Sequence, residues 1–148
     1  MALNRDRVGH RYPTYTYEVS REKVREYAVA TGVEDPAYTA DSAEIPSNEL
    51  IAPPTFAACF TVGRTDLFDD PELGAHTNLV HGNQSYELHQ PIRVGSTLVC
   101  SPQVTDIVDR GRMELLTLQI DCADEATGEP VVTSRGTMIF FNAPEEAD

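Results

Sequence analysis

The segment that decides the fold spans residues 50–63 and reads LIAPPTFAACFTVG. Pro54 suits the first turn of a helix, where the missing backbone N–H removes no hydrogen bond. The residues from 55 to 63 are apolar or small around almost the whole helical circumference. A helix without a polar face is typical of one that is buried on all sides. The segment therefore predicts a central helix enclosed by the rest of the chain.

Four strand-like runs follow this helix. They span residues 79–89, 97–108, 113–122 and 131–141. Apolar and polar residues alternate from Leu116 to Cys122, as a half-buried strand requires. Short polar segments at 109–111 and 125–129 are typical of hairpin loops, which predicts antiparallel pairing. Pro102 interrupts the second run and predicts an edge strand or a bulge there.

Two elements precede the central helix. Residues 14–19 predict a short strand, and residues 21–30 predict a helix that Ser20 caps and Gly32 ends. The apolar face of this helix follows helical spacing. It comprises Val24, Tyr27, Ala28 and Thr31. A long polar connection, residues 33–50, then leads to the central helix, and connections of that length often carry function.

The order of elements is strand, helix, long loop, central helix and four antiparallel strands. A sheet curled round one buried helix satisfies this order, so the predicted class is α+β with a hot-dog fold. The length of 148 residues suits one domain spanning 1–148. The acidic segment 143–148 has little to bury, and we expect a disordered tail there.

Residues 31–38 read TGVEDPAY and resemble a loop of the MaoC-like (R)-specific hydratase/dehydratase family. Catalytic members of that family carry S-G-D-x-N-P-x-H after their first helix. In this chain the family's catalytic Asp falls on Val33, and its catalytic His falls on Tyr38.

Residues 51–55 resemble the start of the family's buried helix, where catalytic members read I-A-H-G-M. The chain reads I-A-P-P-T, and its A-P-P-T-F is similar to the non-catalytic members. Those are the N-terminal domains of double-hot-dog hydratases and the HadA-type subunit of mycolic-acid dehydratases. Residues 80–95 also resemble the family's first long strand and the turn after it, so the resemblance covers about residues 4–141.

The resemblance implies dehydration of a 3-hydroxyacyl thioester or hydration of an enoyl thioester. That chemistry requires a base, an acid and a donor that stabilises the enolate-like oxygen. Val33 cannot transfer a proton, and a tyrosine phenol at position 38 is a poor base near neutral pH. Pro54 takes the place of the glycine that donates its backbone N–H, and proline has none. We therefore expect no catalytic residue in this chain, and no cofactor.

The expected function is that of a non-catalytic, acyl-chain-binding subunit in fatty-acid-type metabolism. Its expected ligand is an acyl-CoA or acyl-carrier-protein thioester. Its expected assembly is a homodimer or a heterodimer with a catalytic hot-dog subunit, because a lone sheet edge favours pairing. The candidate substrate-binding residues are small or apolar and lie on the central helix. They are Thr55, Phe56, Ala58, Cys59 and Val62.

Two alternatives remain open. The chain could be a stand-alone homodimer that binds acyl thioesters without catalysis. It could instead be a homodimeric hot-dog thioesterase or hydratase that uses another carboxylate, such as Glu34, Asp41 or Glu49. Glu34 and Asp35 have a more ordinary role as well, since acidic residues before a helix often make turn hydrogen bonds.

Charge and composition narrow the partners. The formal net charge of −13 argues against nucleic-acid binding, although the first 25 residues are basic and could meet an acidic carrier protein or CoA phosphates. No apolar run is long enough for a membrane helix, and no secretory signal is evident, so we expect a cytoplasmic protein.

Cys59 and Cys122 fall in apolar phases and predict buried thiols. His76, His81 and His89 match no metal-binding spacing, so no metal site is expected.

Overall fold

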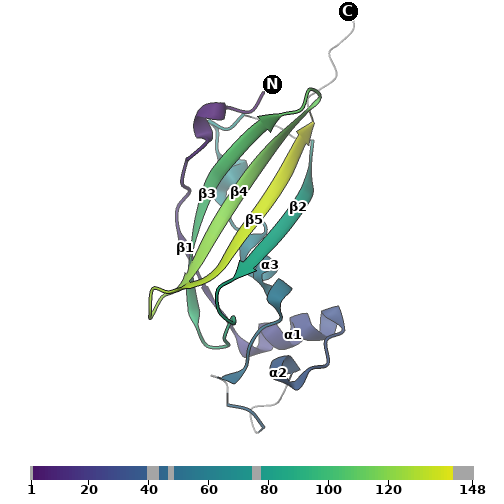
Figure 1. Cartoon of the computed structure of the whole chain (residues 1–148), viewed down its shortest axis with the longest axis vertical. Helices are drawn as coiled ribbons and strands as arrows, with labels where there is room; N and C mark the ends of the chain where they lie inside the picture. Colours follow the sequence, from purple (N-terminus) through teal and green to yellow (C-terminus); the bar gives the residue numbers. More distant parts are fainter. Residues whose placement is uncertain (1, 40–43, 47–48, 75–77, 142–148) are drawn as a thin grey trace, which may run out of the picture.

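The computed structural model describes residues 2–39, 44–46, 49–74 and 78–141. Its strands are β1 (Tyr15–Glu18), β2 (Leu79–Leu88), β3 (Thr97–Asp109), β4 (Met113–Asp124) and β5 (Pro130–Phe141). Its helical segments are η1 (Arg5–Arg7), α1 (Arg21–Thr31), α2 (Pro36–Thr39), η3 (Pro54–Ala57), α3 (Ala58–Thr61) and η4 (Asp66–Asp69). The strands form one antiparallel sheet in the order β1-β3-β4-β5-β2 (Figure 1). The predicted strands and their antiparallel pairing are confirmed.

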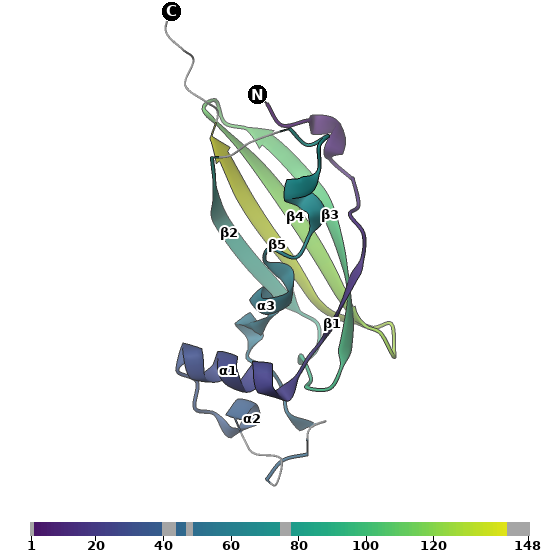
Figure 2. The same cartoon turned by 180° about the vertical axis from the view of Figure 1, so that it is seen from behind.

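One face of the sheet carries the core. Alternate residues of β3 and β4 are buried, as the alternation in the sequence predicts. Val104 lies opposite Leu118 in the register, for example, and both side chains are buried. Figure 2 shows α3 and the preceding η3 lying against this face. One sheet wrapped on one central helix is the predicted α+β hot-dog arrangement.

Pro102 lies in β3, which has a neighbour on each side and is therefore not the predicted edge strand. The pairing of β1 with β3 reaches Tyr15 opposite Cys100 and stops before Pro102. The missing N–H of Pro102 thus breaks no bond of that ladder, while its carbonyl accepts the Tyr12 N–H at 3.1 Å. The register of β3 against β4 does shift, between Val104 and Asp106, so the predicted irregularity lies slightly further along the strand.

The first helix begins and ends where the sequence predicts. The Ser20 side chain accepts the Lys23 N–H at 3.2 Å, and Gly32 has a φ of 73°, a left-handed conformation that favours glycine. Val24 and Ala28 on its apolar face are buried. The short α2 was not predicted and lies within the expected loop. The segment 143–148 lies outside the described residues.

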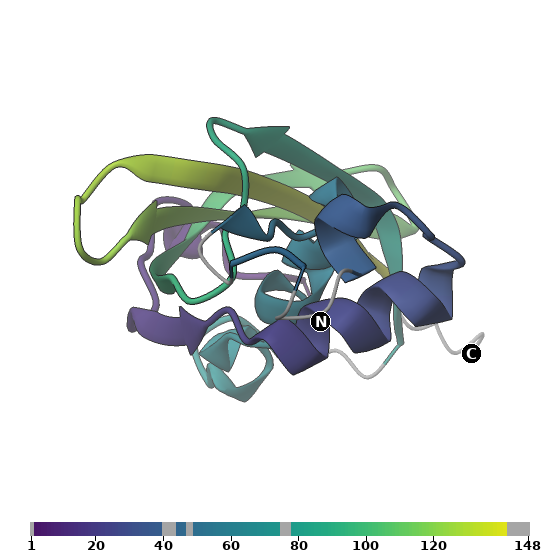
Figure 3. The ribbon, with the colours of Figure 1, turned by 90° about the horizontal axis from the view of Figure 1, so that it is seen from below.

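The central helix differs from the prediction in one respect, because it is not buried on all sides. Phe56 and Phe60 are fully buried, whereas Pro54 and Thr55 are exposed and Val62 is 47 % exposed. Figure 3 shows the helical segments gathered on one side of the curved sheet. One sheet and α1 cover only part of the helix circumference, so the remaining side stays open in a single chain. None of the helices in the described ranges is long and apolar enough to cross a membrane.

Candidate functional site

The three positions that correspond to the family's catalytic groups do not share one hollow. Tyr38 and Pro54 line the same hollow, together with Ile51 and Ala52. Val33 lines a separate one. The structure thus brings two of the three positions together.

The groups present at these positions offer little acid–base chemistry. Pro54 is the first residue of η3, so the donor that a glycine N–H would provide is absent at that point. Glu34 and Glu49 are exposed, and Asp41 lies outside the described residues. Asp35 accepts the Ala37 N–H at 2.9 Å and so begins α2, which is the structural role expected of a carboxylate there.

An apolar cavity of about 170 Å³ lies at the other end of the central helix. It is bounded by the end of α3, the segment around η4 and the inner face of the sheet, and it opens to solvent beside the exposed Val62 and Phe68. Its lining comprises Thr61, Val62, Gly63, Thr65, Leu67, Phe68, Leu79, His81, Gln84, Leu118, Ile120, Ser134, Gly136 and Met138. Of the five predicted substrate-binding residues, Val62 alone belongs to this lining.

The other four predicted residues lie elsewhere on the helix. The Thr55 hydroxyl accepts a hydrogen bond from the Tyr27 hydroxyl of α1 at 2.7 Å, and Phe56 is fully buried with its ring centroid 5.5 Å from that of Tyr27. Ala58 and Cys59 are half-buried. Burial raises the pKa of the Cys59 thiol, which keeps it protonated at neutral pH and makes it a poor nucleophile. The predicted burial of Cys59 is therefore only partial.

Several polar residues of the cavity were missed from the sequence. Gln84 on β2 donates from Nε2 to the Ser134 hydroxyl of β5 at 2.8 Å, and His81 Nε2 lies 3.0 Å from the Asn83 carbonyl. For the β5 side of the cavity, the strand alternation carried a signal. Ser134 and Gly136 occupy inward positions between apolar neighbours, and small inward residues leave space in a core.

The remaining titratable groups show no metal site in the described parts of the chain. No three His, Cys, Asp or Glu residues come together there in a way that could hold a metal ion. His76 lies outside the described residues, and His89 Nε2 is 3.0 Å from the Thr133 hydroxyl. Cys122 is buried, as predicted, and lies opposite the buried Cys100 in the register of β3 and β4.

The basic N-terminal stretch is not a free cationic patch. Arg5 pairs with Asp109 and Arg7 with Asp70 and Glu72 of the same chain. The helix α1 adds further pairs of this kind. They are Lys23 with Glu26 and Arg25 with Glu22. These intramolecular carboxylates neutralise much of the charge that was expected to meet an anionic partner.

Comparison with known proteins agrees with this geometry. A family model described as "FAS1-like, dehydratase domain region" matches residues 6–134. A UPF0336 protein of Streptomyces coelicolor is 39 % identical over 99 % of this chain and 100 % of its own length. The HadBC (3R-hydroxyacyl-ACP dehydratase) complex of Mycobacterium tuberculosis superposes with a TM-score of 0.76 at 23 % identity, covering 93 % of this chain and 99 % of that chain.

A protein described as a MaoC-like dehydratase gives a TM-score of 0.77 at 30 % identity. The match covers 93 % of this chain and 43 % of that longer chain. The family model and the relatives agree with the fold described above, an antiparallel sheet around one central helix. The chain therefore belongs to the UPF0336 proteins within the MaoC-like dehydratase family of hot-dog domains.

Proposed function

We propose that this chain is a cytoplasmic, non-catalytic subunit that binds the acyl chain in an (R)-3-hydroxyacyl thioester dehydratase or enoyl thioester hydratase of fatty-acid-type metabolism. The observation that carries the proposal is a contrast between the two ends of the central helix. Near its start, Tyr38 and Pro54 occupy two of the family's catalytic positions, while Val33, at the third, lines a separate hollow. At its end lies an apolar cavity of about 170 Å³.

The residues at the family's catalytic positions favour a non-catalytic role within an assembly. A dehydratase must move one proton at C2 and another at the hydroxyl, and must stabilise the thioester oxygen between them. Val33 has no titratable group, and Pro54 has no N–H. For the family's reaction, a second hot-dog subunit would therefore have to supply the acid, the base and the N–H donor.

The cavity supports binding of an acyl chain. Leu118, Ile120 and Met138 give its floor an apolar surface on the inner face of the sheet. Each methylene buried there would contribute about 0.8 kcal/mol to binding. Val62 at its rim is the predicted substrate-binding residue that we retain for the cavity. Residues of the open helix face, namely Thr55, Ala58 and Cys59, remain candidates for contact with the chain where a partner subunit would cover them.

The unpaired edge of the sheet supports association with another hot-dog. β2 lies at the edge, and its ten residues include no Pro or Lys, which natural edge strands use to prevent pairing. Among similar structures, HadBC is described as a complex. We propose an acyl-CoA or acyl-carrier-protein thioester as the ligand of the assembled pair, which is either a homodimer or a heterodimer with a catalytic subunit.

Reconstitution tests the proposal. The purified chain alone should not hydrate crotonyl-CoA or longer enoyl thioesters. A catalytic hot-dog with an intact D-x-N-P-x-H loop and A-H-G turn, encoded beside it and co-expressed with it, should form a complex that does. Light scattering on both preparations gives the mass of the assembly.

Two outcomes would contradict the proposal. Robust turnover by the isolated chain that Glu34→Gln or Glu49→Gln abolishes would make it a hydratase with a substitute carboxylate. Acyl-CoA binding by a homodimer that never yields an active complex would make it a stand-alone binding protein.

A further inference from the structure

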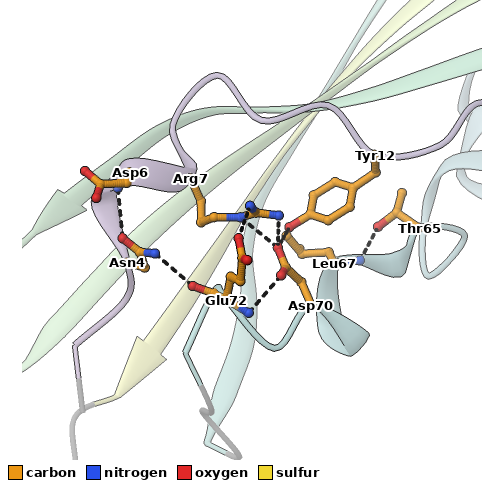
Figure 4. Close-up of polar contacts among 8 residues, drawn as sticks. All are labelled: Asn4, Asp6, Arg7, Tyr12, Thr65, Leu67, Asp70 and Glu72. Carbon is orange, nitrogen blue, oxygen red and sulfur yellow. Dashed lines mark hydrogen bonds and ion pairs between the residues drawn. The ribbon is translucent and has the colours of Figure 1, made fainter.

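The N-terminal segment is tied to the segment before β2 by a network of charged and polar side chains (Figure 4). Arg7 donates from Nε and Nη2 to Asp70 Oδ2 at 2.9 and 2.6 Å, and from Nη1 to Glu72 Oε2 at 2.7 Å. The Tyr12 hydroxyl donates to the same Asp70 oxygen at 2.8 Å. We call these four residues, Arg7, Tyr12, Asp70 and Glu72, the clamp.

The centre of the clamp is shielded from water. The side chains of Arg7 and Asp70 are 14 % and 5 % exposed. Burial opposes ionisation of Asp70, but the hydrogen bonds from Tyr12, the Glu72 amide and Arg7 outweigh it and hold the pKa of Asp70 below its usual value. A shielded, charge-assisted network of this kind restrains its partners more strongly than an exposed ion pair does.

One side of the clamp is fixed to the sheet. The Leu3 N–H donates to both carboxylate oxygens of the buried Glu114 on β4, at 3.0 and 3.1 Å. Further along, the Gly9 N–H donates to the Val104 carbonyl at 2.8 Å. Residues 3–12 therefore form a strap whose position is set by the sheet.

The other side of the clamp is the outer wall of the apolar cavity. Thr65, Leu67 and Phe68 line the cavity, and Asp70 lies two residues after Phe68 in the chain. This segment, residues 65–73, belongs to no strand, so no sheet ladder fixes its distance from β4 and β5. Among the described residues, its polar ties to the strap are the clamp and two hydrogen bonds of Asn4, from N to the Leu73 carbonyl at 2.9 Å and from Nδ2 to the Glu72 carbonyl at 3.0 Å.

We infer that the clamp sets the width of the apolar cavity and thereby selects which acyl chains this subunit accepts. Arg7, Tyr12 and Asp70 are positioning residues, because they hold the wall in place and do not line the cavity. The strap transmits the fixed position of the sheet through Asp70 to Leu67 and Phe68. The inference rests on the proposed function in one respect, the assignment of the cavity to an acyl chain.

The experiment compares wild type with Asp70→Asn, Arg7→Met and the milder Tyr12→Phe. Arg5→Met is the matched control, because it removes a charge of the same strap whose ion-pair partner is Asp109 and not the wall. Hydrogen exchange reports the wall amides of residues 65–73. Calorimetry with butyryl-, octanoyl-, dodecanoyl- and hexadecanoyl-CoA reports selectivity. Asp70→Asn and Arg7→Met remove charged hydrogen bonds, so we expect the rate of amide hydrogen exchange in the wall to rise at least about tenfold in these two variants. The rise should be smaller in Tyr12→Phe.

Selectivity should change with the wall. The ratio of affinities for long and short acyl chains should shift by about tenfold in Asp70→Asn and stay constant in Arg5→Met. Tyr12→Phe leaves the ion pair in place and keeps the test valid if the stronger variants fail to fold. An unchanged ratio in folded clamp variants, or an equal shift in the control, overturns the inference alone. Absence of binding by every acyl-CoA to wild type assembled with its catalytic partner instead overturns the proposed function and the acyl selectivity with it.

Discussion

Val62→Phe tests the cavity most directly. Val62 lines the cavity where α3 ends and is 47 % exposed, so a larger side chain can turn toward solvent or into the cavity without displacing the core. The free energy of unfolding should therefore change by no more than about 0.5 kcal/mol. Inside the cavity, however, a benzyl group in place of an isopropyl group removes space from an acyl chain.

The size of the effect follows from the volume at stake. In a cavity of about 170 Å³, an added ring excludes part of the space that a bound chain would fill. If the ring displaces roughly two methylenes at about 0.8 kcal/mol each, long chains lose about 1.6 kcal/mol of binding free energy. That loss corresponds to about 15-fold weaker binding. Chains too short to reach Val62 should bind as they do to wild type.

Calorimetry with the acyl-CoA series measures this difference, and the reconstituted complex should show the same ratio in turnover. Val29→Phe is the matched control, because it makes the same substitution at an exposed position of α1 that does not line the cavity. Equal losses for short and long chains would mean that the substitution only damaged folding or assembly. An equal change of ratio in Val29→Phe, or no change of ratio in either variant, would refute the placement of the acyl chain.

Two further predictions concern the clamp and the lost catalytic positions. Asp70→Asn should lower the free energy of unfolding at neutral pH by roughly 1.5–3 kcal/mol, the range for hydrogen bonds to a charged group. Because the pKa of Asp70 is depressed in the folded state, this stabilisation is present above the unfolded pKa of about 3.9 and is lost as the pH falls through the folded value. Urea unfolding at several pH values should show wild type and variant converging in acid, and a difference independent of pH would contradict the assignment. Val33→Asp with Tyr38→His should not create hydratase activity on crotonyl-CoA, since Pro54 still lacks its N–H; clear activity of that double variant, without Pro54→Gly, would show that the oxyanion donor lies elsewhere.

The strand pattern was predictable because its cause is local. Alternation from Leu116 to Cys122 reports which side chains face a core, whatever that core contains. The Ser20 cap and the left-handed Gly32 are likewise chemistry between near neighbours in the chain. The presence of Val33, Tyr38 and Pro54 at the positions of the family's catalytic groups was also visible in the sequence, and the absence of catalysis that it predicts stays a prediction.

Burial of the central helix was overestimated for a different reason. An apolar circumference indicates that something covers a helix, but it does not say whether the cover comes from the same chain. One sheet and α1 cover Phe56 and Phe60 and leave Val62 exposed. The edge role expected of Pro102 was wrong because the order of strands in a sheet depends on pairing between distant segments.

The sequence by itself thus determined the α+β hot-dog class and the order of the elements. Only the tertiary structure decided where the cavity lies and what holds its wall. Arg7 and Asp70 are far apart in the chain, and no periodicity connects them. Their pairing depends on the strap and the wall meeting over the same face of the sheet, and such through-space contacts leave no pattern in a single sequence.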